Sequence, residues 1–147
     1  MELSLDNPPT VAAPFGDRFA HVARLDLDGG ALLILSGQVA VDDAGNVVAP
    51  GDAAAQAERI FEIIGGILAG HGATFADVLH IRTYMTNLDD LPAIRDTRRR
   101  LFPAGSASAG GPGNPPASTT VEVSRLFLPG LVIEVEVTAA VRRSPAG

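Results

Sequence analysis

Two stretches of the chain carry apolar residues at the spacing of an amphipathic helix. Across residues 53–70 apolar side chains recur every three or four positions, Asp52 is placed to cap the first turn, and Gly72 follows the last. A shorter stretch follows Asn87–Asp90, which offer helix caps, and continues through Phe102. Each helix has only one apolar stripe, so each must pack against one face of another layer.

Other stretches alternate apolar and polar residues, which predicts β-strands. Residues 19–42 form two extended runs that meet at Asp28-Gly29-Gly30, a sequence suited to a tight hairpin turn. Further strands are predicted at 78–86, around 118–126 and at 131–142. The expected order is β-β-α-β-α-β-β, which makes an α+β domain with two helices on one face of a mixed sheet.

The last two predicted strands each carry a polar face. In 131–142, Glu134 and Glu136 share one face about 7 Å apart, and the other face is apolar. Because both helices are expected on one side of the sheet, the glutamate face is left uncovered, which suggests association between copies of the chain. In 118–126, Ser118 and Thr120 share a polar face, which either meets water or lines a cavity.

The composition limits the classes of function. The 147 residues are 46% hydrophobic and 19% charged, which suits one domain spanning 1–147 with an ample core. The chain has no cysteine and no lysine, so disulfides, thiolate nucleophiles and lysine Schiff bases are excluded. A net charge of −6 opposes binding to nucleic acid. No apolar run reaches membrane-spanning length and no signal peptide is recognisable, so we expect a cytoplasmic protein with no membrane partner.

The spacing of ligand-type residues indicates neither a metal nor a cofactor. His21, His71 and His80 form no HxH or HxxxH motif. The Gly- and Pro-rich segment 103–116 contains "GGPGN", which lacks the Gly-Lys-Ser/Thr ending of a phosphate loop. We therefore expect no metal site and no cofactor.

Four stretches together resemble the RidA/YjgF (Rid, reactive intermediate deaminase) family, over about residues 19–142. They are "LSGQVAVDDAGNVV", "DAAAQAERIFEII", "ADVLHIRTYMTNLDDLPAIRD" and "PPASTTVEVSRLFLPGLVIEVEV". The resemblance implies a chorismate-mutase-like fold and a homotrimer whose sheets form an inner barrel, with three clefts between subunits. It also implies, for the best-known branch, hydrolysis of enamines and imines to ketones with release of ammonia.

The resemblance also assigns candidate site residues. The family glutamate that positions or activates the attacking water falls on Glu134 of "IEVEV", and the family serine before Gly-Gln falls on Ser36. The family tyrosine near the N-terminus falls on Phe19, or on His21 if the alignment shifts by two residues. Phe19 would keep an aromatic ring at this position without the hydroxyl group.

One position departs from the deaminating branch. The family tripeptide "PAR" supplies an arginine that binds the substrate carboxylate, but this chain has "PAS", with Ser118 in that place. A serine offers one neutral hydrogen bond where a guanidinium offers a permanent charge and two parallel ones. The chain thus resembles a branch that lacks this arginine, and Ser118 and Thr120 are expected to supply neutral hydrogen bonds to the ligand.

Two arginines of the second predicted helix are candidates to replace the missing one. At helical spacing Arg98 falls inside the apolar stripe, and Arg95 lies at its edge. Arg95 also aligns with an asparagine that resembles a cleft residue of the family. The alternative is that Arg98 extends along the apolar surface into solvent and that Arg95 makes a surface or intersubunit ion pair.

The sequence leaves three classes of function open. The leading hypothesis is a homotrimer that binds a small organic molecule and hydrolyses an enamine or imine through Glu134, or catalyses a related reaction on a non-standard substrate. A non-catalytic ligand sensor or partner-binding trimer is the alternative, favoured by the loss of the arginine and of the tyrosine hydroxyl. The ribonuclease and translation-inhibitor activity sometimes attached to the family is opposed by the acidic charge.

Overall fold

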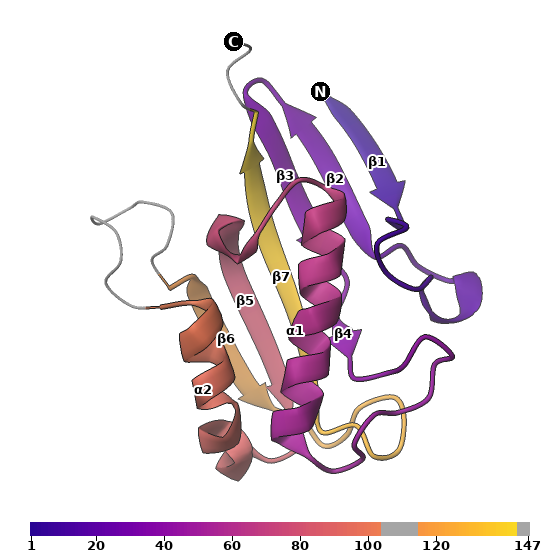
Figure 1. Cartoon of the computed structure of the whole chain (residues 1–147), viewed down its shortest axis with the longest axis vertical. Helices are drawn as coiled ribbons and strands as arrows, with labels where there is room; N and C mark the ends of the chain where they lie inside the picture. The colour runs from indigo at the N-terminus through magenta and orange to yellow at the C-terminus, as the bar shows by residue number, and fades with distance from the viewer. Residues whose placement is uncertain (104–114, 144–147) are drawn as a thin grey trace.

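A computed structural model of the chain describes residues 1–103 and 115–143 (Figure 1). These residues form a seven-stranded sheet. Six strands follow the order β1-β2-β3-β7-β5-β6, and the seventh, the short β4, pairs with β7. β5 and β6 run parallel and the other neighbouring pairs are antiparallel, so the sheet is mixed as predicted. The strands are β1 Glu2–Asp6, β2 Val22–Leu27, β3 Gly30–Leu35, β4 Gln38–Val39, β5 Val78–Met85, β6 Ala117–Glu122 and β7 Ile133–Arg142.

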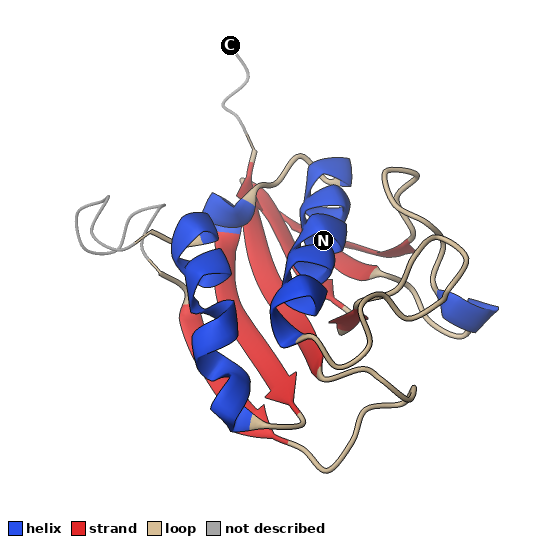
Figure 2. Ribbon diagram, turned by 60° about the horizontal axis from the view of Figure 1, so that its bottom comes forward, coloured by secondary structure: helices blue, strands red, loops and turns tan. Residues whose placement is uncertain are grey.

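Both helices lie on one face of this sheet (Figure 2). α1 spans Ala53–Gly70, and the Asp52 side chain caps it by accepting the Ala55 N–H at 3.0 Å. α2 spans Leu91–Leu101 and follows a 3-10 turn, η3, at Leu88–Asp90. Further 3-10 turns are η1 at Phe15–Asp17 and η2 at Phe75–Asp77. The two predicted helices and their position on one face are confirmed.

The core lies between the helices and the sheet. β7 alternates along its length, with Ile133, Val135 and Val137 buried toward the helices and Glu134 and Glu136 on the opposite face. β5 also alternates, with Ile81, Thr83 and Met85 buried toward the helices. Its pairing with β7 is irregular between Val78 and His80. The uncovered glutamate face that the sequence predicted is therefore present.

The helix-free face has an apolar half on β1, β2 and β3. Leu3 pairs across the strands with Leu25, and Leu25 pairs with Leu32, so these leucines share that face. Leu3 and Ile34 are 69% and 51% exposed. An exposed apolar area of this kind is typical of a surface that another protein chain covers.

Three details differ from the predicted order. The strand β1 was not expected; it adds Glu2–Asp6 to the edge of the sheet through pairing with β2. The strand β4 follows β3 after a break at Ser36 and Gly37. Both strands pair with β7: β3 with its C-terminal half, and β4 with Val135 and Glu134 nearer its start. The strand predicted around 118–126 ends at Glu122, because β5 ends at Met85 and no further register partner is left for β6.

Two remaining observations concern membranes and the Gly- and Pro-rich segment. Within the residues described, neither helix combines the length and the apolar character needed to cross a membrane. The segment predicted to be irregular, 103–116, lies mostly outside the described residues.

Candidate active site

Glu134 lies on the helix-free face of β7, against the main chain of Gly37. A Cβ atom at Gly37 would collide with Glu134 Oε1, and would lie 3.0 Å from Cδ and 3.2 Å from Cγ of the same side chain. The carboxylate is half-buried. Burial raises the pKa of Glu134, and the nearby Glu136 raises it further. A carboxylate with a raised pKa is a stronger base than an ordinary one, which suits it to accept and return a proton.

The neighbouring Glu136 is already occupied by other side chains. It accepts a hydrogen bond from the Tyr84 hydroxyl at 2.6 Å, and Arg82 Nη1 lies 3.5 Å from the same carboxylate oxygen. The hydrogen bond to Glu136 is the main reason that the pKa of Tyr84 is raised, so this phenol keeps its proton. Among the described residues no side chain donates to Glu134, which leaves its carboxylate available to a water molecule or a ligand.

Ser36 sits at the break between β3 and β4, next to Gly37. Its hydroxyl donates to the carbonyl of Ala20 at 2.7 Å, and its N–H donates to the carbonyl of His21 at 2.9 Å. The hydroxyl proton is therefore used to join the ends of two strands. Ser36 can still accept a hydrogen bond, so its predicted part in the site stays a prediction.

The two candidates for the family tyrosine position differ in exposure. His21 is buried, its Nε2 lies 2.8 Å from the Ala12 carbonyl, and its Nδ1 lies 3.3 Å from Gln38 Nε2. Both ring nitrogens of His21 are therefore occupied by groups of the protein itself. Phe19 is 46% exposed.

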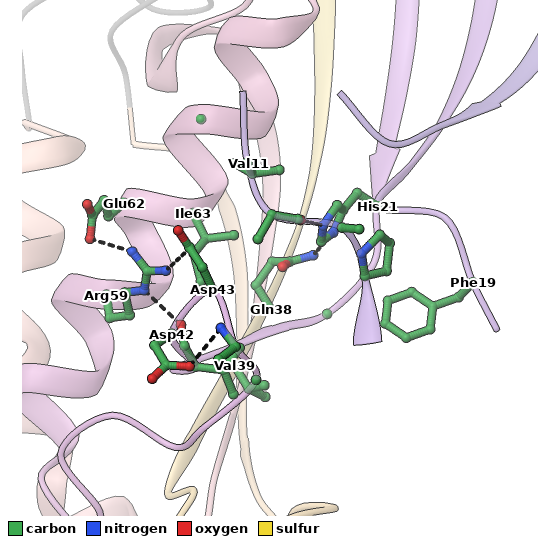
Figure 3. Close-up of a pocket in the computed structure, with 18 of the residues that line it drawn as sticks. Val11, Phe19, His21, Gln38, Val39, Asp42, Asp43, Arg59, Glu62 and Ile63 are labelled. Carbon is green, nitrogen blue, oxygen red and sulfur yellow. Dashed lines mark hydrogen bonds and ion pairs between the residues drawn. The ribbon is translucent and has the colours of Figure 1, made fainter. Parts of the chain in front are cut away.

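A cleft of about 710 Å³ lies beside α1. The N-terminal segment around Ala12, whose carbonyl contacts His21, forms part of its wall. Figure 3 shows Phe19, His21 and Gln38 on one side of it and Arg59 and Glu62 on the other. Gly37, which contacts Glu134, also lines the cleft. The cleft therefore borders the main-chain segment against which Glu134 lies.

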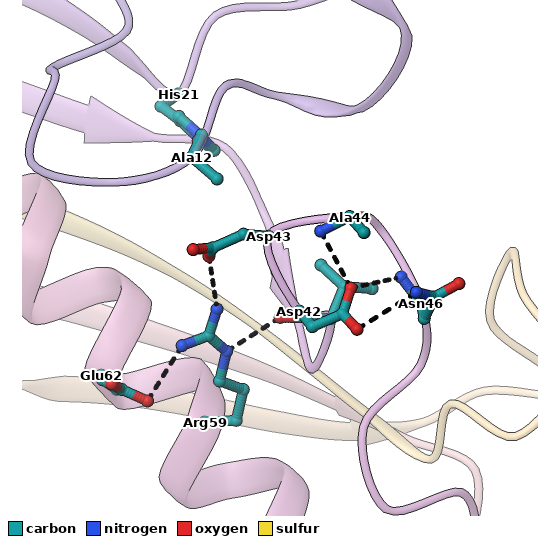
Figure 4. A network of polar contacts seen from close by, with 9 residues as sticks. Ala12, His21, Asp42, Asp43, Ala44, Asn46, Arg59 and Glu62 are labelled. Carbon is teal, nitrogen blue, oxygen red and sulfur yellow. Dashed lines mark hydrogen bonds and ion pairs between the residues drawn. The ribbon is translucent and has the colours of Figure 1, made fainter.

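The arginine in this cleft is fully paired. Arg59 donates from Nε to the Val41 carbonyl at 2.8 Å, from Nη1 to Glu62 at 3.0 Å and from Nη2 to Asp43 at 3.2 Å (Figure 4). In the same loop Asp42 accepts two backbone N–H groups and the Asn46 side chain, and these hydrogen bonds lower the pKa of Asp42. Arg59 thus fixes a loop and offers no free charge to an anionic ligand.

Ser118 and Thr120 lie on the opposite face of the sheet from Glu134. In the parallel pairing of β5 and β6, Ser118 is aligned with the buried Ile81 and Thr120 with the buried Thr83, which places both on the helix side. Within one chain, β5 separates β6 from β7. A small ligand of one subunit therefore cannot contact Ser118 and Glu134 of that same subunit at once.

The two candidate arginines of α2 differ sharply. Arg98 is half-buried and donates from Nη2 to Ser118 Oγ at 3.0 Å, whereas Arg95 is exposed. Burial lowers the pKa of Arg98. Of the two, only Arg98 reaches the position where the family arginine is missing.

Three residues on or beside the Glu134 and Glu136 face were not predicted as site residues from the sequence: Gly37, Tyr84 and Arg82. The alternation in "HIRTYM" places Arg82 and Tyr84 on the face opposite the buried residues, a signal that could have been used. The contact of Gly37 with Glu134 depends on the pairing of β4 with β7, which joins residues far apart in the chain. In the described residues no group of three or more histidine or acidic side chains could hold a metal ion.

Comparison with known proteins identifies the family. A family model described as "Endoribonuclease L-PSP" matches residues 18–141. This chain belongs to the RidA/YjgF family. The RidA/YjgF assignment agrees with the fold, since the crystal structure titled "YJGF gene product" from E. coli superposes with a TM-score of 0.69 at 29% identity, covering 91% of this chain and 94% of that one.

Two sequence relatives show the range of names inside the RidA/YjgF family. A "2-iminobutanoate/2-iminopropanoate deaminase" of Salmonella typhimurium is 30% identical over 141 residues, which is 96% of this chain and 97% of the relative. "Protein DfrA" of Myxococcus xanthus is 31% identical over 121 residues, covering 82% of this chain and 81% of the relative. The RidA/YjgF resemblance and the fold class expected from the sequence are both confirmed.

Proposed function

We propose that this protein is a Rid-type hydrolase that converts a small enamine or imine to a carbonyl compound and ammonia. The observation that carries the proposal is Glu134, a half-buried carboxyl with a raised pKa that lies against Gly37 on an uncovered sheet face. The name of the Salmonella relative, which covers nearly the whole chain, supports the same chemistry.

The reacting species is the imine, and an enamine enters the same path after it tautomerises in solution, by gaining a proton at its β-carbon and losing one from nitrogen. Glu134 acts as the general base and then as the general acid. As the water oxygen bonds to the imine carbon, the carboxylate takes a water proton and the C=N electron pair moves to nitrogen. Glu134 returns the proton to that nitrogen and gives a carbinolamine. It then takes the hydroxyl proton and delivers it to the amino group, so the C–N bond breaks, the C=O bond forms and ammonia leaves. Glu134 ends the cycle in its starting state.

The complete site is proposed to form between two subunits of a homotrimer. One subunit contributes Glu134 and Gly37, and its neighbour contributes Ser118 and Thr120. Two facts support this arrangement: these pairs lie on opposite sheet faces of one chain, and the helix-free face carries exposed apolar residues. Phe19 is proposed to form part of the apolar wall of the site.

The test measures hydrolysis of an imine generated in solution. An amino-acid oxidase acting on alanine or 2-aminobutyrate produces the imino acid, and the rate of ammonia release is followed with and without this protein. Wild type is expected to accelerate the reaction, and Glu134→Gln to abolish the acceleration while leaving the thermal melting curve intact. Equal acceleration by both proteins would overturn the proposal.

A second candidate is a non-catalytic ligand-binding trimer. It is favoured by two substitutions of the family pattern, Ser118 for the arginine and Phe19 for the tyrosine. This candidate predicts that small ligands raise the melting temperature while wild type and Glu134→Gln both leave the imine hydrolysis rate unchanged.

A further inference from the structure

The cleft beside α1 reaches the helix side of the sheet, which is the side opposite Glu134. In the pairing of β4 with β7, Gln38 is aligned with Val135, which is buried toward the helices. Directly paired residues share a face, so the Gln38 side chain points to the helix side. Gln38 and residues of α1 line the same cleft. The cleft is therefore formed within one chain, behind the strand that carries Glu134.

Gln38 is a buried amide with one unused oxygen. Only 5% of the residue is exposed, and its Nε2 donates to the Ser36 carbonyl at 3.0 Å and lies 3.3 Å from His21 Nδ1. A carbonyl partner requires the amide nitrogen at this end, which leaves Oε1 on the other. Figure 3 shows that end turned away from His21, and among the described residues no group donates to it. A buried acceptor of this kind is suited to take an N–H of a ligand.

The charged residues that line the cleft are mostly acidic. They are Asp42, Asp43 and Glu62, against the single cation Arg59. Arg59 donates to one oxygen of Asp43 and one of Glu62, so each of these exposed carboxylates keeps a second oxygen for another donor. The balance of charge therefore favours a cationic ligand and opposes an anionic one.

Two exposed aromatic rings border the same cleft. Three phenylalanines of the chain, Phe61, Phe75 and Phe102, pack edge to face in the core. In contrast, Phe19 and Phe127 are 46% and 61% exposed, and both line the cleft. Exposed rings at a concave surface offer contacts to a flat apolar group and to a cation.

One wall of the cleft is fixed by close contacts with α1. Thr10 Oγ1 donates to the Gly66 carbonyl at 2.7 Å, and a Cβ atom at Gly66 would lie 2.5 Å from Val11 Cγ1. The next residue, Ala12, is held through its carbonyl by His21. These contacts shape the cleft, and its volume of about 710 Å³ lies in the range of small-molecule sites.

We propose that this cleft is a second binding site, which takes a small aromatic amine in its protonated form. The ammonium group donates to Gln38 Oε1 and is attracted by the carboxylates of Asp43 and Glu62. The ring packs against Phe127. The site does not rest on the proposed function, since it lies on the opposite side of the sheet from Glu134 and needs no chemical step.

Tryptamine is the probe, because it joins an indole ring to an ammonium group. Isothermal titration of wild type is expected to show saturable binding. Asp43→Asn combined with Glu62→Gln removes both charges and keeps acceptors for Arg59, and should weaken binding about fivefold. The matched control is Asp89→Asn combined with Asp96→Asn, which changes the net charge equally at exposed positions outside the cleft and should leave binding unchanged.

Two more variants test the acceptor and the ring. Gln38→Leu should weaken tryptamine binding about tenfold, since the ammonium loses a buried partner. Because Gln38 also holds Ser36, the exposed Phe127→Ala gives a test that does not disturb the core, with an expected loss of about fivefold. Leu79→Ala, at an exposed apolar position of β5, is its control. Binding that neither Phe127→Ala nor the paired carboxylate change weakens would overturn the proposal.

Two analogues of the probe test its charge. Indole-3-propionate carries a carboxylate in place of the ammonium group and should not bind at the concentrations that saturate tryptamine. Tryptophol carries a neutral hydroxyl group there; it should bind more weakly than tryptamine and should not respond to the loss of the Asp43 and Glu62 charges. Binding of indole-3-propionate as tight as that of tryptamine would overturn the assignment of the ligand class.

NMR locates the bound amine and separates this site from the proposed hydrolase. In ¹⁵N-labelled protein, tryptamine should shift the amide signals of Gly45 and Gly66, which line the cleft, and leave those of Gly29 and Gly72 in place. Glu134→Gln should bind tryptamine as wild type does. Loss of binding in Glu134→Gln would show that the amine occupies the site around Glu134 and would overturn the proposal. Tryptamine binding at the cleft without imine hydrolysis by wild type would reject the hydrolase and keep this second site.

Discussion

The carboxylate of Glu134 lies directly over the main chain of Gly37, so closely that a Cβ atom at Gly37 would collide with Glu134 Oε1. The two residues are 97 positions apart in the sequence and meet because β4 and β7 pair at Val39 and Glu134. This contact supports the position of Glu134 on the sheet face that the helices leave open.

Gly37→Ala is expected to displace the Glu134 side chain. The φ angle of Gly37 is not in the left-handed region, so alanine is tolerated by the backbone, and the effect should come from the collision with Glu134. Imine hydrolysis should fall at least tenfold, while the melting temperature changes little. Gly72→Ala is a contrasting variant: Gly72 has a φ of 72° and open space around it, so it should lose stability and keep activity per folded molecule.

The activity of the protein should depend on the ionisation of Glu134. Its base form appears as the pH rises through a pKa that lies above the ordinary value of 4.5, so kcat/KM should rise with pH over the same range. Glu136→Gln removes the nearby negative charge and should move this rise to lower pH. NMR titration of the Glu134 carboxyl carbon checks the same shift without activity. A rise that does not move in Glu136→Gln would argue against Glu134 as the titrating group.

We expect light scattering to give the mass of three chains. The apolar half of the helix-free face, which includes the exposed Ile34, should be covered in the assembly. Ile34→Asp should therefore shift the protein toward smaller species and reduce hydrolysis, since the proposed site needs two subunits. Ala93→Asp, which adds the same charge to an exposed position of α2, serves as the control and should stay trimeric. A monomeric wild type at micromolar concentration would contradict both the trimer and the shared site.

Gln56 is a buried amide that joins three backbone groups of two loops. Its Nε2 donates to the carbonyls of Ala49 at 3.0 Å and Gly130 at 2.8 Å, and its Oε1 accepts the Val132 N–H at 2.9 Å. Gln56→Met keeps the length of the side chain and removes these hydrogen bonds. The free energy of unfolding should fall by about 2–5 kcal/mol, as measured by urea denaturation, because buried backbone groups lose their partners. A change below about 0.5 kcal/mol would show that water replaces the amide.

Binding to RNA should be weak and should disappear at moderate salt. The net charge of −6 opposes attraction to the phosphate backbone. Fluorescence anisotropy with a labelled single-stranded RNA at about 0.15 M salt is expected to show no saturable binding. RNA cleavage that survives purification and disappears in Glu134→Gln would favour a ribonuclease over the hydrolase.

Periodicity predicted both helices, and the end signals predicted the boundaries of α1; at the second helix Asn87 caps the 3-10 turn η3, and α2 itself ends at Leu101. The apolar spacing and the Asp52 cap predicted α1 at its observed position, since both are local properties of consecutive residues. The same alternation predicted that Glu134 and Glu136 share the face away from the core. The strand β1 was missed because a five-residue edge strand with both faces largely exposed carries little hydrophobic signal.

The sequence by itself determined which residues have side chains suited to binding or proton transfer, because charge, hydroxyl groups and strand alternation are properties of single residues or of near neighbours in the chain. It limited the candidates to Glu134, Ser36, Ser118, Thr120, Phe19, His21, Arg95 and Arg98. Only the tertiary structure decided among them: it buried His21 against Ala12, left Arg95 in solvent and placed Arg98 on Ser118. It also set Ser118 and Glu134 on opposite faces. These outcomes depend on which strands pair and in which register, and strand pairing joins residues whose separation along the chain leaves no local signal.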